Sequence, residues 1–103
     1  MSWMENHELS QQCETQAEDL CIHGDYARAS ELYLLAAKAE EKAFRCLADS
    51  QVRAIGITAM SAISLYSKSC EPEQAERACR EFLDTKLLPP FAVEQIEDFI
   101  KCS

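Results

Sequence analysis

The side chains that could carry catalytic or metal-binding chemistry are few and widely spaced. Two histidines, His7 and His23, could act as bases, and six cysteines occupy positions 13, 21, 46, 70, 79 and 102. A nucleophilic cysteine needs a neighbouring base, and a structural zinc site needs four ligands, commonly as two closely spaced pairs. Cys21 and His23 form one such pair, but no second pair follows. The spacing therefore predicts neither a catalytic site nor a metal site.

Two pairs of acidic residues are adjacent in the sequence: Glu18–Asp19 and Glu40–Glu41. Adjacent residues of a helix point about 100° apart, so we interpret both pairs as solvated surface charge rather than as a general acid and base. Only two glycines are present, which leaves no glycine-rich loop to hold a phosphate. We expect no enzymatic activity and no cofactor.

The composition predicts one all-α domain that spans residues 1–103. A chain of 103 residues fits a single domain. Its 48% hydrophobic content favours a packed core. Its two glycines and three prolines leave few positions that would interrupt a long helix. The abundance of Ala, Glu and Leu, with Gln and Lys beside them, favours helix over strand.

The net charge of −8 bears on the class of partner. Such a field repels phosphate, so we expect no nucleic acid ligand and favour a protein or peptide with basic segments. The charge is also uneven: residues 1–27 carry six acidic and no basic side chains, whereas residues 28–68 carry six basic and four acidic ones. Attraction between the acidic and the basic segment could hold the first helix against the rest of the chain or against a second copy.

The N-terminal residues lack the basic region and apolar run of a signal peptide. No stretch of about eighteen uncharged apolar residues is present, so we expect no membrane span. Together these features predict a cytoplasmic protein with reduced cysteines. Because most of the cysteines fall at apolar positions of a helical pattern, we expect them to be buried.

Helical periodicity divides the chain into two helical units and a closing helix. The units are expected at about 9–48 and 51–86, and the closing helix at about 90–102. Within 9–22, one face carries Leu9, Cys13, Ala17, Leu20 and Cys21. Gly24 and Asp25 are a typical stop and cap, Asp49 and Ser50 offer a second break, and prolines begin the last two helices.

The expected helix at 51–68 is apolar around almost its whole circumference, with no charge between Arg53 and Lys68. Such a helix must be covered on several sides. Two alternatives stay open: other helices of the chain cover it, or a second copy does so in a twofold homodimer. Gly56 within it is expected to permit a close helix approach.

An internal repeat relates the two units. Ala29 and Tyr33 correspond to Ala75 and Cys79 with an offset of 46 residues, and the turns before them are in register. The spacing resembles the tetratricopeptide repeat, a helix–turn–helix unit. Glu41 stands where that pattern has its closing proline. The residues that match or carry the repeat are Ala17, Leu20, Gly24, Tyr26, Ala29, Tyr33, Ala36, Tyr66 and Ala75.

The resemblance, which extends to small uncharacterised bacterial tetratricopeptide proteins, implies an antiparallel helix–turn–helix array of about five helices with a C-terminal capping helix. It also implies a non-enzymatic protein-interaction or scaffold module that binds a peptide or a partner helix in a groove. Carried over by spacing, the groove residues are Glu14, Glu18, Cys21, Met60, Ser64 and Lys68. Two alternatives are an acidic chaperone for a secreted client and a module that binds a small ligand between the third helix and its neighbours.

Overall fold

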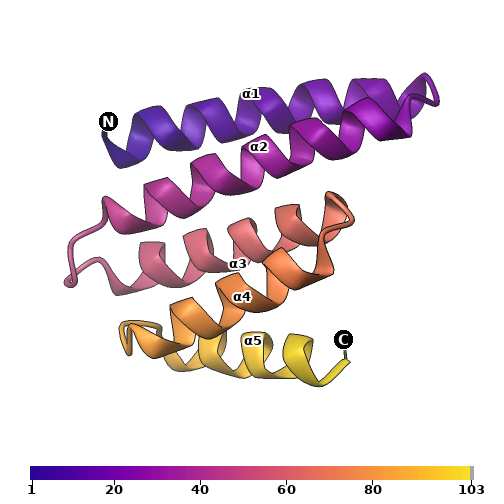
Figure 1. Cartoon of the computed structure of the whole chain (residues 1–103). Coiled ribbons are helices and arrows are strands. Elements are labelled where there is room, and N and C mark those ends of the chain that lie inside the picture. The colour runs from indigo at the N-terminus through magenta and orange to yellow at the C-terminus, as the bar shows by residue number, and fades with distance from the viewer. Residues whose placement is uncertain (103) are drawn as a thin grey trace.

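The computed structural model describes residues 1–102. Five helices follow one another along this part of the chain (Figure 1): α1 (Trp3–Ile22), α2 (Tyr26–Arg45), α3 (Val52–Lys68), α4 (Pro72–Asp84) and α5 (Pro90–Cys102). Within residues 1–102 there is no strand. The prediction of an all-α chain of five helices is confirmed.

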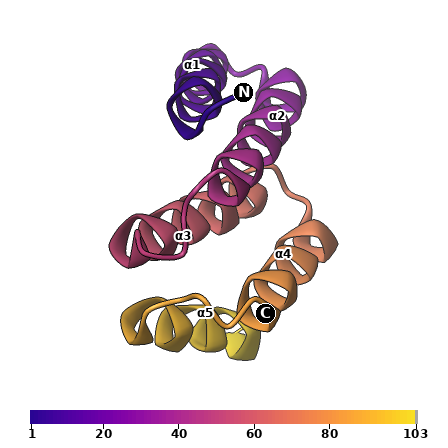
Figure 2. The same ribbon diagram turned by 90° about the vertical axis from the view of Figure 1, so that its left-hand side faces the viewer.

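The helices form two layers. Figure 2 shows α1, α3 and α5 on one side of the molecule and α2 and α4 on the other, so the chain alternates between the layers. Each helix runs antiparallel to the one before it (Figure 1). The helices α1, α3 and α5 therefore run in the same direction. The antiparallel array with a closing C-terminal helix is confirmed, whereas its assignment to the tetratricopeptide family stays a prediction.

The two short turns between paired helices have the same backbone design. Gly24 adopts a left-handed φ of 80°, and Asp25 then caps α2 by accepting a hydrogen bond from the Arg28 N–H at 3.3 Å. In the second turn Cys70 takes the equivalent position with a φ of 60°, and Glu71 precedes α4. In each turn the residue after the left-handed one donates its N–H to the carbonyl five residues back. The predicted register of the two turns is confirmed.

The first helix begins at Trp3 rather than at residue 9. Ser2 and Glu5 form a reciprocal capping box, in which the Ser2 hydroxyl accepts from the Glu5 N–H and the Glu5 carboxylate accepts from the Ser2 N–H. This cap satisfies two N–H groups that a helix start otherwise leaves without partners. The apolar stripe alone missed the start because the first two turns of α1 are largely polar.

The second helix ends at Arg45, and α3 begins only at Val52. Asp49 and Ser50, which we expected to offer the new cap, lie before the cap position, which Gln51 occupies. The Gln51 side chain reaches back instead, and its Oε1 accepts from the Ala48 N–H at 2.9 Å. This contact stabilises the turn rather than the start of α3.

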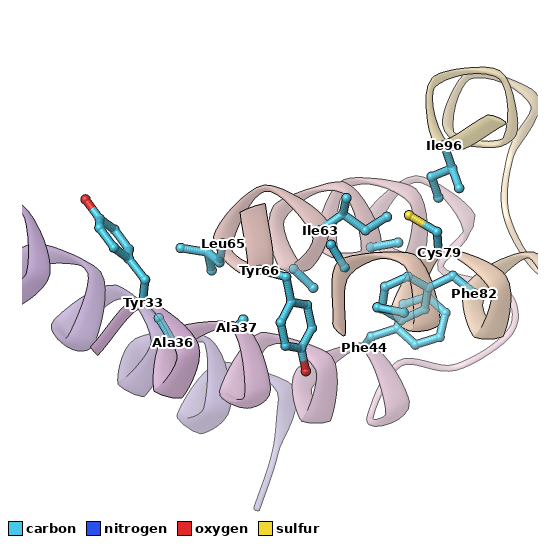
Figure 3. Close-up of a cluster of buried hydrophobic side chains, with 14 of the residues drawn as sticks. Tyr33, Ala36, Ala37, Phe44, Ile63, Leu65, Tyr66, Cys79, Phe82 and Ile96 are labelled. Carbon is cyan, nitrogen blue, oxygen red and sulfur yellow. The ribbon is translucent and has the colours of Figure 1, made fainter. Parts of the chain in front are cut away.

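The hydrophobic core extends through the array and joins the helices to one another (Figure 3). The Phe44 and Phe82 rings lie 4.5 Å apart between centroids and join α2 to α4. Ile63, Cys79 and Ile96 bring together α3, α4 and α5. Small side chains complete the core where helices cross closely: Ala17, Ala29, Ala36, Ala59, Ala62, Ala75 and Ala78.

The residues assigned to the repeat pattern are mostly buried, as the pattern requires. Tyr33 and Tyr66 are buried, while Leu20 is half-buried against the core. Gly24 in the turn is exposed, and so is Tyr26, 67% of which is exposed at the first position of α2. It belongs to the turn in sequence but does not contribute to the core.

The helices of this chain cover most of α3. Its buried residues, which include Ile55, Ile63, Leu65 and Tyr66, pack among α2, α4 and α5. The Trp3 indole of α1 donates a hydrogen bond to the Thr58 hydroxyl at 3.1 Å and covers another side. The first of the two alternatives therefore accounts for the apolar circumference of α3, and a homodimer has to be argued from another surface.

The expectation that most cysteines are buried is wrong. Only Cys79 is fully buried within the described chain, Cys13 and Cys21 are half-buried, and the thiols at 46, 70 and 102 are exposed. All six are free thiols. The exposed three lie at or beyond the ends of α2, α3 and α5, where the apolar stripe no longer faces a neighbouring helix.

Gly56 brings α3 close to the residues that begin α5. A Cβ atom built at Gly56 would lie 2.6 Å from Pro89 Cγ and 2.8 Å from Phe91 Cζ. Pro89 is buried and its ring is rigid, so it cannot move aside cheaply. The close approach expected at this glycine is confirmed, although its partner is the entry to α5 rather than the middle of a helix.

We expect Gly56→Ala to lower the free energy of unfolding by about 1 kcal/mol. Alanine favours the helix by about 1 kcal/mol over glycine, but overpacking against a rigid ring costs about 1–3 kcal/mol. Urea denaturation measures the difference. Ser64→Ala, at an exposed position of the same helix, is the matched control and should gain a few tenths of a kcal/mol; a more stable Gly56→Ala would contradict the packing at Pro89.

We expect Cys70→Gly to raise the free energy of unfolding by about 1 kcal/mol, because a left-handed conformation costs a side-chain-bearing residue about 1–2 kcal/mol and costs glycine almost nothing. Thermal and urea unfolding under reducing conditions measure the gain. Cys70→Ala also removes the thiol but keeps the strained conformation, so it should be near neutral. Equal stabilisation by both substitutions would show that the thiol, not the backbone, is responsible.

Candidate functional site

The six residues expected to line a groove lie on two neighbouring helices of one layer. α1 and α3 run side by side, and the Lys68 ammonium donates to Glu14 Oε2 at 3.3 Å. These two residues are 54 positions apart in sequence. The structure thus brings into contact an acid and a base that the resemblance had placed only in the same groove.

Glu18 and Cys21 belong to the same end of this helix pair. Lys68 Nζ lies 5.8 Å from the centroid of the Tyr33 ring. Burial raises the pKa of the Tyr33 hydroxyl, and the neighbouring Cys21 thiol and the carboxylates of Glu18 and Glu14 raise this pKa further. Tyr33 therefore stays a neutral hydroxyl among two acids, a thiol and an ammonium group.

Met60 and Ser64 continue the surface along α3. They precede Lys68 by eight and four residues, so all three lie on one side of the helix. Ser64 is exposed and Met60 half-buried. Ile57 lies on the same side, and 51% of it is exposed. We call this surface the α1–α3 face; it consists of Glu14, Glu18, Cys21, Ile57, Met60, Ser64 and Lys68.

A second polar cluster lies between the layers, where surface charge was expected. The Glu41 carboxylate is only 6% exposed. Its Oε1 accepts from the Tyr66 hydroxyl at 2.6 Å and from Arg77 Nη2 at 3.0 Å, and its Oε2 accepts from Arg77 Nη1 at 3.1 Å. Arg45 Nη2 donates to Oε2 at 3.0 Å from one turn further along α2. We call Glu41, Arg45, Tyr66 and Arg77 the Glu41 cluster.

The protonation states of the Glu41 cluster follow from this geometry. Burial by itself raises the pKa of Glu41, but hydrogen bonds from Arg77 and Tyr66 and the charges of Arg77 and Arg45 outweigh it, so this pKa lies below its ordinary value. Burial and the Glu41 carboxylate raise the pKa of Tyr66 to about 12. The hydrogen bond to Glu41 raises the pKa of Arg77. Arg77 is thus cationic, Glu41 is anionic and Tyr66 is neutral at pH 7.

Glu40 is also buried, with 2% of it exposed. His7 Nδ1 of α1 lies 2.9 Å from Glu40 Oε1, and the Trp3 ring stacks on the His7 ring at 4.6 Å between centroids. The interpretation of Glu40 and Glu41 as solvated charge is therefore wrong. Each carboxylate is held by groups from a different neighbouring helix.

The sequence did carry a signal for these two carboxylates. Glu40 follows Ala36 by four residues and Glu41 follows Ala37 by four, so both continue the buried stripes of α2. An acid on such a stripe needs a buried partner. The partners of Glu41, Tyr66 and Arg77, lie 25 and 36 residues away, and His7, the partner of Glu40, lies 33 residues away. No local pattern identifies them.

Within residues 1–102, no group of three or more His, Cys, Asp and Glu side chains could hold a metal ion. The second histidine, His23, follows the end of α1, and its Nδ1 lies 2.8 Å from the Asp19 carbonyl of that helix. The described helices include none that is both long and apolar enough to cross a membrane.

One hollow lies where the small-ligand alternative places its site, among α3, α4 and α5. It has a volume of about 410 Å³ and is lined by Ser67, Cys70, Pro72, Ala75 and Phe99. Its walls offer one hydroxyl and one exposed thiol as polar groups. Such a lining can accommodate an apolar group but gives few contacts that would fix its orientation.

Comparisons of the chain with models of protein families, with curated proteins and with solved structures find no match.

We expect Glu41→Gln to lower stability at pH 7 and to flatten the loss of stability in acid. Because the pKa of Glu41 is lowered on folding, its charged form contributes stability above about pH 4.5, and this contribution is lost as the pH falls through the folded pKa. The neutral amide leaves Arg77 without its buried counter-charge, which costs about 1–3 kcal/mol at pH 7. Urea titrations between pH 7 and pH 3 measure both effects.

Glu81→Gln is the matched control for this substitution. Glu81 also contacts Arg77, but it is exposed and lies one turn further along the same helix. Its removal should change stability by less than about 0.5 kcal/mol. If Glu41→Gln and Glu81→Gln behaved alike, the Glu41 cluster would not join the helices as described.

Proposed function

We propose that the chain is a non-enzymatic protein-interaction module that binds a peptide or a partner helix along the α1–α3 face. The observation that carries the proposal is the composition of this face. It offers apolar surface at Ile57 and Met60 beside hydrogen-bonding and charged groups at Ser64, Lys68 and Glu18. Mixed surfaces of this kind are typical of reversible protein contacts.

The electrostatics of the face support a partner with basic residues. Lys68 is already paired with Glu14, whereas the exposed Glu18 of α1 has no cation from another helix among the contacts of the described chain. The overall charge of −8 acts in the same direction. A segment that alternates apolar and basic side chains fits both properties.

Rigidity of the supporting helices also favours this function. Ala17, Ala29 and Tyr33 are buried behind α1, and the Glu41 cluster ties α2 to α3 and α4. A face held in place loses little conformational entropy when it binds a partner. With six free thiols, the proposal includes a reducing, cytoplasmic setting.

Selection from a random peptide library on the immobilised full-length protein tests the proposal. We expect enriched peptides with Lys or Arg next to apolar residues. Ile57→Glu and Glu18→Lys should each weaken the selected peptides about tenfold or more. Two matched variants, Leu35→Glu and Glu31→Lys, change equally exposed residue types on α2 and should leave affinity unchanged.

Three outcomes are informative. Loss of binding in the two face variants alone supports the proposal. Peptides that bind equally well to Ile57→Glu and Glu18→Lys would place the partner elsewhere. A selection without enrichment would overturn peptide binding and favour the small-ligand alternative at the hollow beside Cys70.

A further inference from the structure

A strip of apolar side chains is exposed along the edge of the array that α1 and α2 form together. Leu9 is 43% exposed, Leu35 is 54% exposed, and Met1 and the half-buried Cys13 adjoin them. These residues line a hollow of about 230 Å³ together with Asn6, Lys38, Ala39 and Lys42. Isolated exposed leucines are ordinary, but a contiguous apolar strip usually marks an interface.

This strip lies on the side of the helix pair that faces away from α3. Leu9 precedes Glu14, which contacts α3, by five residues and is therefore about 140° around α1 from it. Leu35 precedes the core residue Phe44 by nine residues and is about 180° around α2 from it. Figure 2 shows no further helix of the described chain beyond α1 and α2 at this end. No other part of residues 1–102 covers the strip.

The two sides of the strip carry opposite charge. The exposed charged residues of α1 within about 100° of Leu9 are all acidic: Glu5, Glu8 and Asp19. Those of α2 are Arg28, Lys38, Lys42 and Arg45, against a single acid, Glu31. The edge therefore has an acidic side, an apolar centre and a basic side.

Such a surface is complementary to itself under one symmetry operation. A twofold axis that runs along the helices, between two facing copies, places α1 of each copy over α2 of the other. The acidic side then faces the basic side twice, and the apolar strips meet at the centre. In this arrangement neighbouring helices all run antiparallel, as in a four-helix bundle.

We propose that a second copy of this chain docks on the α1–α2 edge and forms a twofold homodimer with a four-helix bundle at its centre. Two helices of 20 residues are each about 30 Å long and lie roughly 10 Å apart. They offer a face of roughly 600 Å² per copy, or about 1,200 Å² in total, which reaches the lower end of stable interfaces. A partner protein of one charge would match only one side of the strip.

Sedimentation equilibrium of the full chain gives the first test. The expected mass is about twice the chain mass of 11.6 kDa. Leu35→Glu places a charge at the centre of the strip and should yield the monomer mass at concentrations where the unmodified chain is dimeric. Ile57→Glu is the matched control, since Ile57 is 51% exposed but lies on the α1–α3 face, and it should stay dimeric.

A charge-reversal pair distinguishes this geometry from any other self-association. Lys38→Glu with Lys42→Glu makes both sides of the strip acidic, whereas Glu8→Lys with Gln12→Lys makes the α1 side basic. Each double variant should be monomeric alone, and an equimolar mixture should recover the dimer mass because both contacts then join unlike charges. Circular dichroism of each variant verifies that these exposed substitutions leave the helices intact.

A monomeric mass for the unmodified chain at every concentration up to about 1 mM would overturn the proposal. So would a dimer that survives Leu35→Glu and both charge reversals, since another surface would then hold it. Neither outcome affects peptide binding on the α1–α3 face, because Leu35→Glu and Ile57→Glu test the two surfaces separately.

Discussion

The carboxylate of Glu41 joins the two helical units. It lies on α2, in the first unit, and accepts hydrogen bonds from Tyr66 and Arg77, which lie on α3 and α4 of the second. A buried carboxylate without partners costs several kcal/mol. Any slide of α3 or α4 along α2 would separate these groups, so the cluster fixes the relative position of three helices. The α1–α3 face depends on that position, because α3 forms one half of it.

The features that the sequence predicted correctly are those that depend on interactions between residues close together in the chain. Gly24 and Asp25 specify a turn and a cap by themselves, and Ala29, Tyr33 and Ala36 specify the buried side of α2 by their spacing alone. Glu40 and Glu41 were misjudged because the burial of a carboxylate depends on a distant partner. The exposed cysteines were misjudged because a stripe in sequence does not say where the neighbouring helix ends.

The sequence predicted more of the α1–α3 face than of the α1–α2 edge. The resemblance to the repeat placed Glu14 and Lys68 on one surface, but it did not predict their contact, because the two residues are 54 positions apart and not 46. Leu9 shows the limit, because its position in the pattern placed it with Cys13 and Ala17 on the inner face of α1. In the structure α1 packs on α2 and α3 through Ala17 and Trp3, which leaves Leu9 exposed. Amphipathic spacing identifies the apolar side of a helix, not how much of that side its neighbours cover.

The alternating layers also bear on how the chain folds. Most of the helix packing joins neighbours along the chain, so each new helix closes only a short loop on its predecessor. Proteins rich in such local contacts fold within microseconds to milliseconds. Two hydrogen bonds join positions that are especially far apart in sequence: the one from Trp3 to Thr58 spans 55 residues, and the one from Lys68 to Glu14 spans 54. Since both hydrogen bonds join helices that α2 already holds together, we expect them to form last in folding, after each unit has formed its own hairpin.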